Sequence, residues 1–241
     1  MVFKTSFIIY SGEFMENLIL TNSALIRANQ CNKSYYLNLY YPELKDESDE
    51  NHRALSERRK IIAKLTNHIF PNGKYSGVDV TGSCEMSYVH TKELINSDAK
   101  TIFNACFKHE ELFCFVDVLY RDSDTWNAYG IWDKDDPDSH IILTGTFQHC
   151  IMQRNGINVR NCYSIVYKTS RSNEGVIDLN YDIVSITNQV SGYQPNLNNK
   201  ITEIRKIAKN GSIPDISPGM HCTIPNKCDF YNYCKFSVSN N

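Results

Sequence analysis

The chain has 241 residues, of which 41% are hydrophobic and 22% are charged, a composition typical of a globular protein. A chain of this length can bury one substantial core, or one core with a small appendage. The formal net charge of −2 excludes an overall attraction to polyanions, so nucleic-acid binding would depend on a local basic patch.

The opening of the chain predicts neither a membrane span nor a signal peptide. No apolar run approaches the ~20 residues needed to cross a bilayer. The run from Phe7 to Tyr10 is too short for the apolar core of a signal peptide. We therefore expect a cytoplasmic protein without membrane partners, in which residues 1–17 form an N-terminal extension.

The first part of the chain is predicted to be helical. The polar residues at 22–23 can cap a helix that runs towards Tyr36 and carries Cys31. A second helix is expected from about Ala54 to Ile69, because apolar residues recur there at helical spacing. The turn-forming sequence at 71–73 should end it.

The middle of the chain shows both strand and helix patterns. Helices are expected over Thr91–Asn96 and Thr144–Asn155, the second ended by Gly156, whereas Gly130 and the acidic run 133–138 mark a loop. The expected strands are Val78–Val80, Thr101–Phe107, Leu112–Tyr120, Trp126–Trp132 and Asn161–Tyr167. This mixture predicts an α/β fold.

The last part of the chain predicts helices and then a short tail. Asn180–Val190 is expected to begin a helix, and Leu197–Lys209 is amphipathic and ends at Asn210-Gly211. The tail from Pro214 onwards has little apolar content, so a metal that links it to the rest would help it fold. The sequence thus predicts a main domain over 18–213 and a cysteine-rich tail over 214–241.

The nine cysteines should remain reduced in a cytoplasmic protein. Cys84 lies beside a glycine and is expected in a loop or strand. Four others lie in apolar or strand-like surroundings and are predicted to be small buried hydrophobic residues. These four are Cys106, Cys114, Cys150 and Cys162.

The tail has the spacing C-x5-C-x5-C at Cys222, Cys228 and Cys234. Three thiols so close in sequence can converge on one centre without a long loop closure. Iron–sulfur clusters usually require four thiolates. Cys31, in the polar setting 29–33, suits the fourth position, so these four residues are the predicted ligands.

Zinc and unmetallated thiols are the alternatives to an iron–sulfur centre. Zinc sites usually use C-x2-4-C pairs, and the tail has none. His221 would be able to replace a cysteine as a ligand, or to make a local hydrogen bond. Clustered unmetallated thiols would be open to oxidation.

From Leu18 to Cys234 the chain resembles a bacterial family that joins a RecB-like PD-(D/E)XK nuclease fold to a four-cysteine iron–sulfur centre. Iron–sulfur CRISPR-associated RecB-type exonucleases share this plan. The two ends carry the specific part of the resemblance, and the middle motifs are short. The matching segments are Leu20–Leu37, Tyr41–Leu44, Thr101–Phe107, Phe115–Leu119, Phe147–Gln148 and Pro218–Cys234. The resemblance implies a restriction-endonuclease-like α/β fold, with a mixed central sheet flanked by helices, in which the tail closes on Cys31 around a [4Fe-4S] cluster.

A nuclease of this class carries an acidic residue on one strand and Glu-x-Lys on the next. The two carboxylates hold Mg²⁺ or Mn²⁺, which activates water, and the lysine positions that water. Asp117 matches the first acid, although an ion pair or a position at the end of a strand would also explain a charge there. Gly130 and Trp132 stand at the Glu and Lys positions, and neither side chain can perform those roles.

Other positions of the resemblance are also altered or uncertain. The upstream helix presents Arg59 and Ile61 near the positions of a glycine and an acid, whereas Gln148 matches a glutamine that shapes the site in active relatives. The acidic loop Asp133–Asp136 would have to supply displaced ligands if Mg²⁺ or Mn²⁺ were still bound.

The sequence therefore predicts an iron–sulfur protein with a degenerate nuclease fold that binds or assembles with DNA or a protein. One alternative is an active metal-dependent DNA exonuclease with rearranged ligands, and another is redox or sulfur chemistry in a biosynthetic or regulatory complex. Two basic helix faces are candidates for nucleic-acid binding, unless they are simply solvated. Their residues are Arg58, Arg59, Lys60 and Lys64 on one face, and Lys200, Arg205, Lys206 and Lys209 on the other.

Overall fold

The computed structural model describes residues 19–46, 49–76, 84–133, 138–171 and 177–239. The expected extension over 1–17 and the expected strand Val78–Val80 lie outside these ranges. Within them, no helix combines the length and the apolar character needed to cross a membrane.

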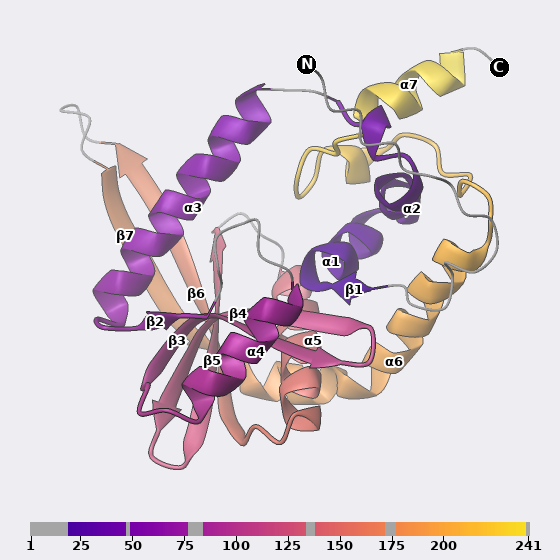
Figure 1. Cartoon of the computed structure of the whole chain (residues 1–241). Coiled ribbons are helices and arrows are strands. Elements are labelled where there is room, and N and C mark those ends of the chain that lie inside the picture. Colours follow the sequence, from indigo (N-terminus) through magenta and orange to yellow (C-terminus); the bar gives the residue numbers. More distant parts are fainter. Residues whose placement is uncertain (1–18, 47–48, 77–83, 134–137, 172–176, 240–241) are drawn as a thin grey trace, which may run out of the picture.

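A seven-stranded mixed sheet forms the centre of the molecule, with the path β2-β3-β4-β5-β6-β7 and with β1 paired to β4 (Figure 1). The strands are β1 (Leu20–Thr21), β2 (Lys74–Tyr75), β3 (Thr101–His109), β4 (Leu112–Asp122), β5 (Thr125–Asp133), β6 (Val159–Arg171) and β7 (Ile177–Ser185). The β3–β4, β4–β5 and β6–β7 pairs are antiparallel, whereas β5–β6, β2–β3 and β1–β4 are parallel. A helix connects β5 to β6, as a parallel pair requires.

Helices flank both faces of this sheet. They are α1 (Asn22–Gln30), α2 (Asn32–Tyr40), α3 (Asp49–Ile69), α4 (Cys84–Ile95), α5 (Asp138–Arg154), α6 (Thr187–Lys209) and α7 (Tyr231–Ser239), with short 3-10 helices η1 (Pro42–Leu44) and η2 (Met220–Cys222). The expected α/β class, a mixed sheet between helices, is confirmed at this level.

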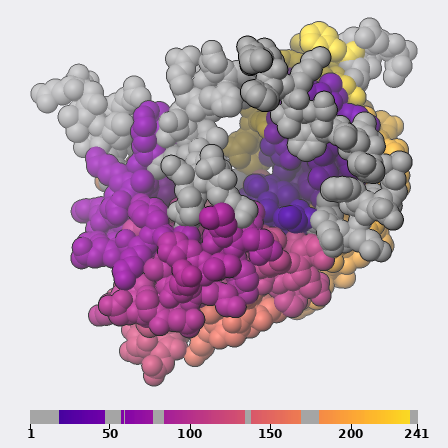
Figure 2. Space-filling model, in the orientation of Figure 1, coloured from indigo at the N-terminus to yellow at the C-terminus, as the bar shows by residue number. Residues whose placement is uncertain are grey.

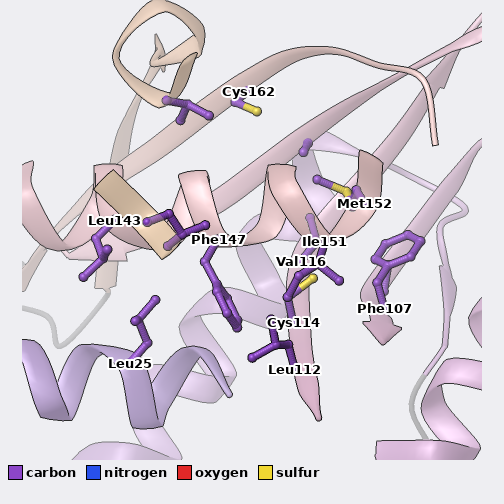
Figure 3. Packing of buried hydrophobic residues seen from close by; sticks show 14 of the residues in the cluster. Leu25, Phe107, Leu112, Cys114, Val116, Leu143, Phe147, Ile151, Met152 and Cys162 are labelled. Atoms are coloured by element: carbon purple, nitrogen blue, oxygen red, sulfur yellow. The ribbon is translucent and has the colours of Figure 1, made fainter. Parts of the chain in front are cut away.

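The larger core lies between the sheet and helices α1, α5 and α6 (Figure 3). Phe147 and Ile151 of α5 pack there with Leu25 of α1, and all three are almost fully buried. Gly145 allows α5 and α6 to pack closely, because a Cβ at this position would lie 3.0 Å from Ile186 and 3.1 Å from Val190. A smaller core on the other face joins Leu65 of α3 to the sheet.

The helix expected from residue 22 towards Tyr36 is two helices, and the expectation that Cys31 lies within a helix is wrong. Cys31 is extended, with φ −160° and ψ 116°, and separates α1 from α2. The cap is also one residue earlier than expected, since Thr21 Oγ1 accepts a hydrogen bond from Ala24 N. The break turns the Cys31 side chain to the start of α2.

The helix expected over Asn180–Val190 is also wrong in its first half. Strand β7 continues to Ser185, and α6 begins only at Thr187. Tyr181, Ile183 and Val184 favour a strand intrinsically, and pairing with β6 decides the structure.

Other boundaries differ less. Gly130 and Asp133 lie within β5 rather than in a loop, and α3, α4 and α5 all begin earlier than expected. Gly156 and Gly211 follow their helices with φ +74° and +68°, as expected for helix ends.

The cysteines outside the predicted ligand set mostly lie where expected. Cys106, Cys114 and Cys162 are buried, whereas Cys150 is half-buried against the larger core. Cys84 is the first residue of α4, so its expected loop or strand position is wrong.

Candidate metal centre and the neighbouring strand site

Four thiols from the two ends of the chain come close to one another. Cys31 lies at the break between α1 and α2, Cys222 in η2, Cys228 before α7, and Cys234 within α7. In the space-filling view, the indigo N-terminal helices and the yellow C-terminal segment lie on the same side of the molecule (Figure 2). All four residues are free thiols.

The electrostatic coupling of these thiols shows their proximity. Burial raises the pKa of Cys234, Lys33 lowers it, and negative charge at the other three thiols raises it again. Burial also raises the pKa of Cys31, and charge at Cys228 and Cys222 adds to this effect. Each thiolate therefore makes its neighbours harder to ionise unless a cation compensates them.

Polar groups around the thiols favour negative charge on sulfur. The backbone N–H groups of Ser34 and Lys33, in the first turn of α2, lower the pKa of Cys31. The N–H of Phe230 donates to Cys228 Sγ at 3.5 Å, and Cys228 Sγ lies 3.5 Å from Ser34 Oγ.

The tail is held in place mainly by polar contacts with α1 and α2. Arg27 pairs with Asp229 at 2.7 Å, and Lys33 Nζ donates to the carbonyl of Ile216 at 3.2 Å. Gln30 Nε2 donates to the carbonyls of His221 and Asn226, both at 2.7 Å. These contacts place the cysteines without any bond between the sulfur atoms.

The apolar support of the tail is small by comparison. Its cluster of buried residues consists of Leu37, Phe230 and Cys234. A cavity of about 470 Å³ lies between α1, α2 and the segment 226–229, and both Cys31 and Cys228 line it.

The donor set was compared with the needs of a metal. Among the residues that the structure describes, no three or more His, Cys, Asp or Glu side chains are arranged to hold a single metal ion. A zinc ion would require ligand sulfurs about 2.3 Å from one point. A cluster places irons and sulfides between its thiolates and so holds them farther apart, and four soft thiols are the donors that it requires. The donor chemistry therefore fits an iron–sulfur cluster better than one zinc ion.

Asp117 lies on β4 where pairing with β5 ends. Its Oδ2 accepts a hydrogen bond from Ile131 N at 2.7 Å, beyond the last backbone pair, Val118 with Tyr129. Burial raises the pKa of Asp117 to about 6, although the Ile131 N–H and the charge of Arg58 oppose this shift. The carboxyl group thus satisfies a backbone donor that the strands leave unpaired.

Trp132 covers the position where the resemblance would place a glutamate side chain. A Cβ on Gly130 would lie 2.7 Å from Trp132 Nε1. Within β5, Asp133 is the last residue, and the remainder of the acidic loop, 134–136, lies outside the described residues.

Gln148 and Asn22 both bind the backbone of Phe115 on β4. Gln148 Nε2 donates to the Phe115 carbonyl at 2.7 Å, and Asn22 Nδ2 donates to the same oxygen at 2.8 Å. Phe115 N in turn donates to Asn22 Oδ1 at 3.2 Å. The sequence indicated Asn22 only as a possible helix cap, so this long-range role was missed.

The two basic faces are partly neutralised by their own neighbours. On α3, Lys60 pairs with Glu57 at 3.0 Å. On α6, Lys200 pairs with Glu203 at 3.2 Å and Arg205 lies 3.4 Å from Glu111. The remaining members described are Arg58, which is half-buried, and the exposed Lys64, Lys206 and Lys209, whereas the side chain of Arg59 is outside the described part.

Comparisons with known proteins add little to this geometry. No protein-family model matches the chain, and no curated protein matches it either. A solved structure titled "Crystal structure of SSO0001" is similar over 92% of this chain and 85% of that chain, with 11% identity and a TM-score of 0.37. Similarity at this level does not establish a shared family.

Proposed function

We propose that the chain is an iron–sulfur protein in which Cys31, Cys222, Cys228 and Cys234 hold a [4Fe-4S] cluster. The observation that supports this most directly is the gathering of four free thiols from the two ends of the chain, close enough to shift each other's pKa. When bound, such a cluster supplies four links to thiolates and an electron-transfer centre.

The surroundings of the thiols suit this role. Lys33 and the N–H groups at the start of α2 stabilise thiolates. The N–H of Phe230 donates to Cys228 Sγ, and hydrogen bonds of this kind adjust the properties of cluster ligands. The small apolar cluster of the tail leaves its attachment in need of a further link.

We also propose that the main domain is a degenerate PD-(D/E)XK nuclease fold. Its order, α4-β3-β4-β5-α5-β6, carries Asp117 on one strand, positions 130 and 132 on the next, and Gln148 on the following helix. The resemblance implies the same order for the acid, the Glu-x-Lys pair and the glutamine.

The site residues support binding or assembly rather than hydrolysis. Asp117 is engaged by Ile131 N, Trp132 covers Gly130, and Gln148 is bonded to Phe115. One carboxylate alone holds Mg²⁺ or Mn²⁺ poorly. The module would then serve to bind a protein or nucleic acid, and metal-dependent cleavage of DNA should be absent in an assay with either ion.

The test is iron and sulfide analysis of protein purified without oxygen. We expect a brown protein with about four irons and four sulfides per chain, as a four-thiolate cluster requires. Cys228→Ser should lose both, whereas Cys150→Ser, at a half-buried thiol on α5, should retain them. Zinc without sulfide in the parent protein would contradict the cluster.

A further inference from the structure

Strand β7 forms an unprotected edge of the sheet. It pairs with β6 along all of its length without a bulge, and no described strand pairs with its other edge (Figure 1). All six side chains from Asn180 to Ser185 are exposed. Among them, Tyr181 is 37% exposed, Ile183 46% and Val184 48%.

This edge lacks the features that keep monomeric sheets apart. Such edges usually carry lysine, proline or a bulge, or are very short. The nine residues of β7 include no lysine and no proline, and Tyr, Ile and Val all favour further strand pairing. An apolar, regular edge of this length needs a partner.

The surface beside β7 is also incomplete in a single chain. A cavity of about 250 Å³ is lined by Val184 of β7 together with Ser164 and Ile186. Ser164 is 2% exposed, and its hydroxyl makes no hydrogen bond within the described structure. Additional side chains next to Val184 would close this cavity.

We propose that β7 pairs antiparallel with β7 of a second copy of this chain, so that the two sheets become continuous. A twofold axis at Tyr181 places each tyrosine opposite its counterpart. In this register Asp182 lies opposite Asn180. An axis at Asp182 would instead oppose two carboxylates, which is unfavourable across a strand pair. Self-pairing is therefore compatible with the charges of the strand, and it adds to the function proposed above without depending on it.

The partner is a second copy because the strand complements itself in this register. The exposed acid of one copy meets an amide of the other, and the central aromatic residues meet each other. The Tyr181 ring also lies 6.5 Å from the ring of His68 on α3, so the end of α3 lies beside the proposed contact.

The experiment is sedimentation velocity of the full chain over a range of concentrations. The parent should be a dimer, and Tyr181→Lys should be a monomer because two ammonium groups would oppose each other at the axis. Tyr181→Asp should also be a monomer. A mixture of the two variants should form a heterodimer, because lysine then lies opposite aspartate, and this mixture shows that each variant is folded.

Val89→Lys is the matched control, since Val89 on α4 is 53% exposed and far from β7 in sequence. It should remain a dimer. A parent protein that is monomeric at every concentration would overturn the proposal, and so would a Tyr181→Lys variant that stays dimeric.

Discussion

Asp117 shows how a residue with a catalytic counterpart in the resemblance can have a structural role. Its carboxyl group accepts the Ile131 N–H at the point where β4 and β5 separate. Burial raises its pKa from the ordinary 3.8 to about 6. The native chain therefore binds this proton more tightly than the unfolded chain, and stability falls as pH rises from about 4 through about 6.

Asp117→Asn should remove this dependence on pH. The amide oxygen of asparagine can still accept the Ile131 N–H, and no buried charge forms. A shift of roughly two pKa units corresponds to about 3 kcal/mol, so the variant should be more stable than the parent by up to that amount at pH 8. The difference should almost vanish at pH 4. Urea denaturation at both pH values measures it, and a loss of stability at pH 8 would show that the charged form is required.

Gly130 and Trp132 are coupled by the position of the indole. Gly130→Ala should destabilise the protein by about 1–3 kcal/mol, because the new Cβ would overlap Trp132 Nε1. In a Trp132→Val background, the same change should cost much less. A double-mutant cycle measured by denaturation tests this coupling.

Gly192→Ala provides the control for this cycle. Gly192 lies within α6, and a Cβ there would meet nothing within 4 Å. Alanine favours a helix over glycine, so this change should stabilise the protein by about 0.5–1 kcal/mol. Equal costs for Gly130→Ala with and without Trp132 would mean that the indole is not the cause.

Among the structural elements, the edge of β4 depends most on contacts from other parts of the chain. Strand β1 pairs with its start, Asn22 and Gln148 bind Phe115, and β5 pairs from Val118 onwards. The side chain of Asn22 thus occupies the interval between two strands, at the first residue of α1.

Asn22→Ala should therefore destabilise the protein by about 1–3 kcal/mol, because it leaves Phe115 N without a partner. The amide hydrogen of Phe115 should exchange faster with solvent in this variant. Ser23→Ala is the control, since its hydroxyl bonds only the exposed Thr21 Oγ1 among the contacts described. Unchanged exchange at Phe115 would mean that Asn22 does not hold this edge.

The elements that the sequence predicted well are those whose pattern is local and long. Strands β3, β4 and β5 were expected within two residues of their observed ends, because apolar and β-branched residues continue throughout them. The break at Cys31 was missed because residues on both sides favour a helix. Strand β7 was missed because its side chains are exposed, so pairing with β6 alone fixes it.

On the scale of the whole molecule, the two ends of the chain are joined by few contacts. Arg27 with Asp229 and Gln30 with two carbonyls bridge them, around a small apolar cluster. The sequence predicted which cysteines would meet, since their spacing and the resemblance both indicated it. It did not predict Arg27, Gln30 or Asp229, because a pairing over about 200 residues leaves no local pattern.

Removal of iron should release the tail before the sheet unfolds, if the proposed cluster supplies the missing link. Limited proteolysis of protein treated with an iron chelator should cut first within 214–234. The sheet should remain intact, because its cores do not include the tail. A tail that is equally resistant with and without iron would show that the polar contacts suffice.

The position of the two tryptophans has a consequence for optical measurements. Both tryptophans of the chain, Trp126 and Trp132, lie on β5, and the guanidinium of Arg121 lies 4.5 Å from the Trp126 ring. The ultraviolet emission of the whole protein therefore arises mainly from one strand. A ligand or partner that displaces the indole of Trp132 from Gly130 would change the emission spectrum, so the altered site carries its own fluorescent reporter.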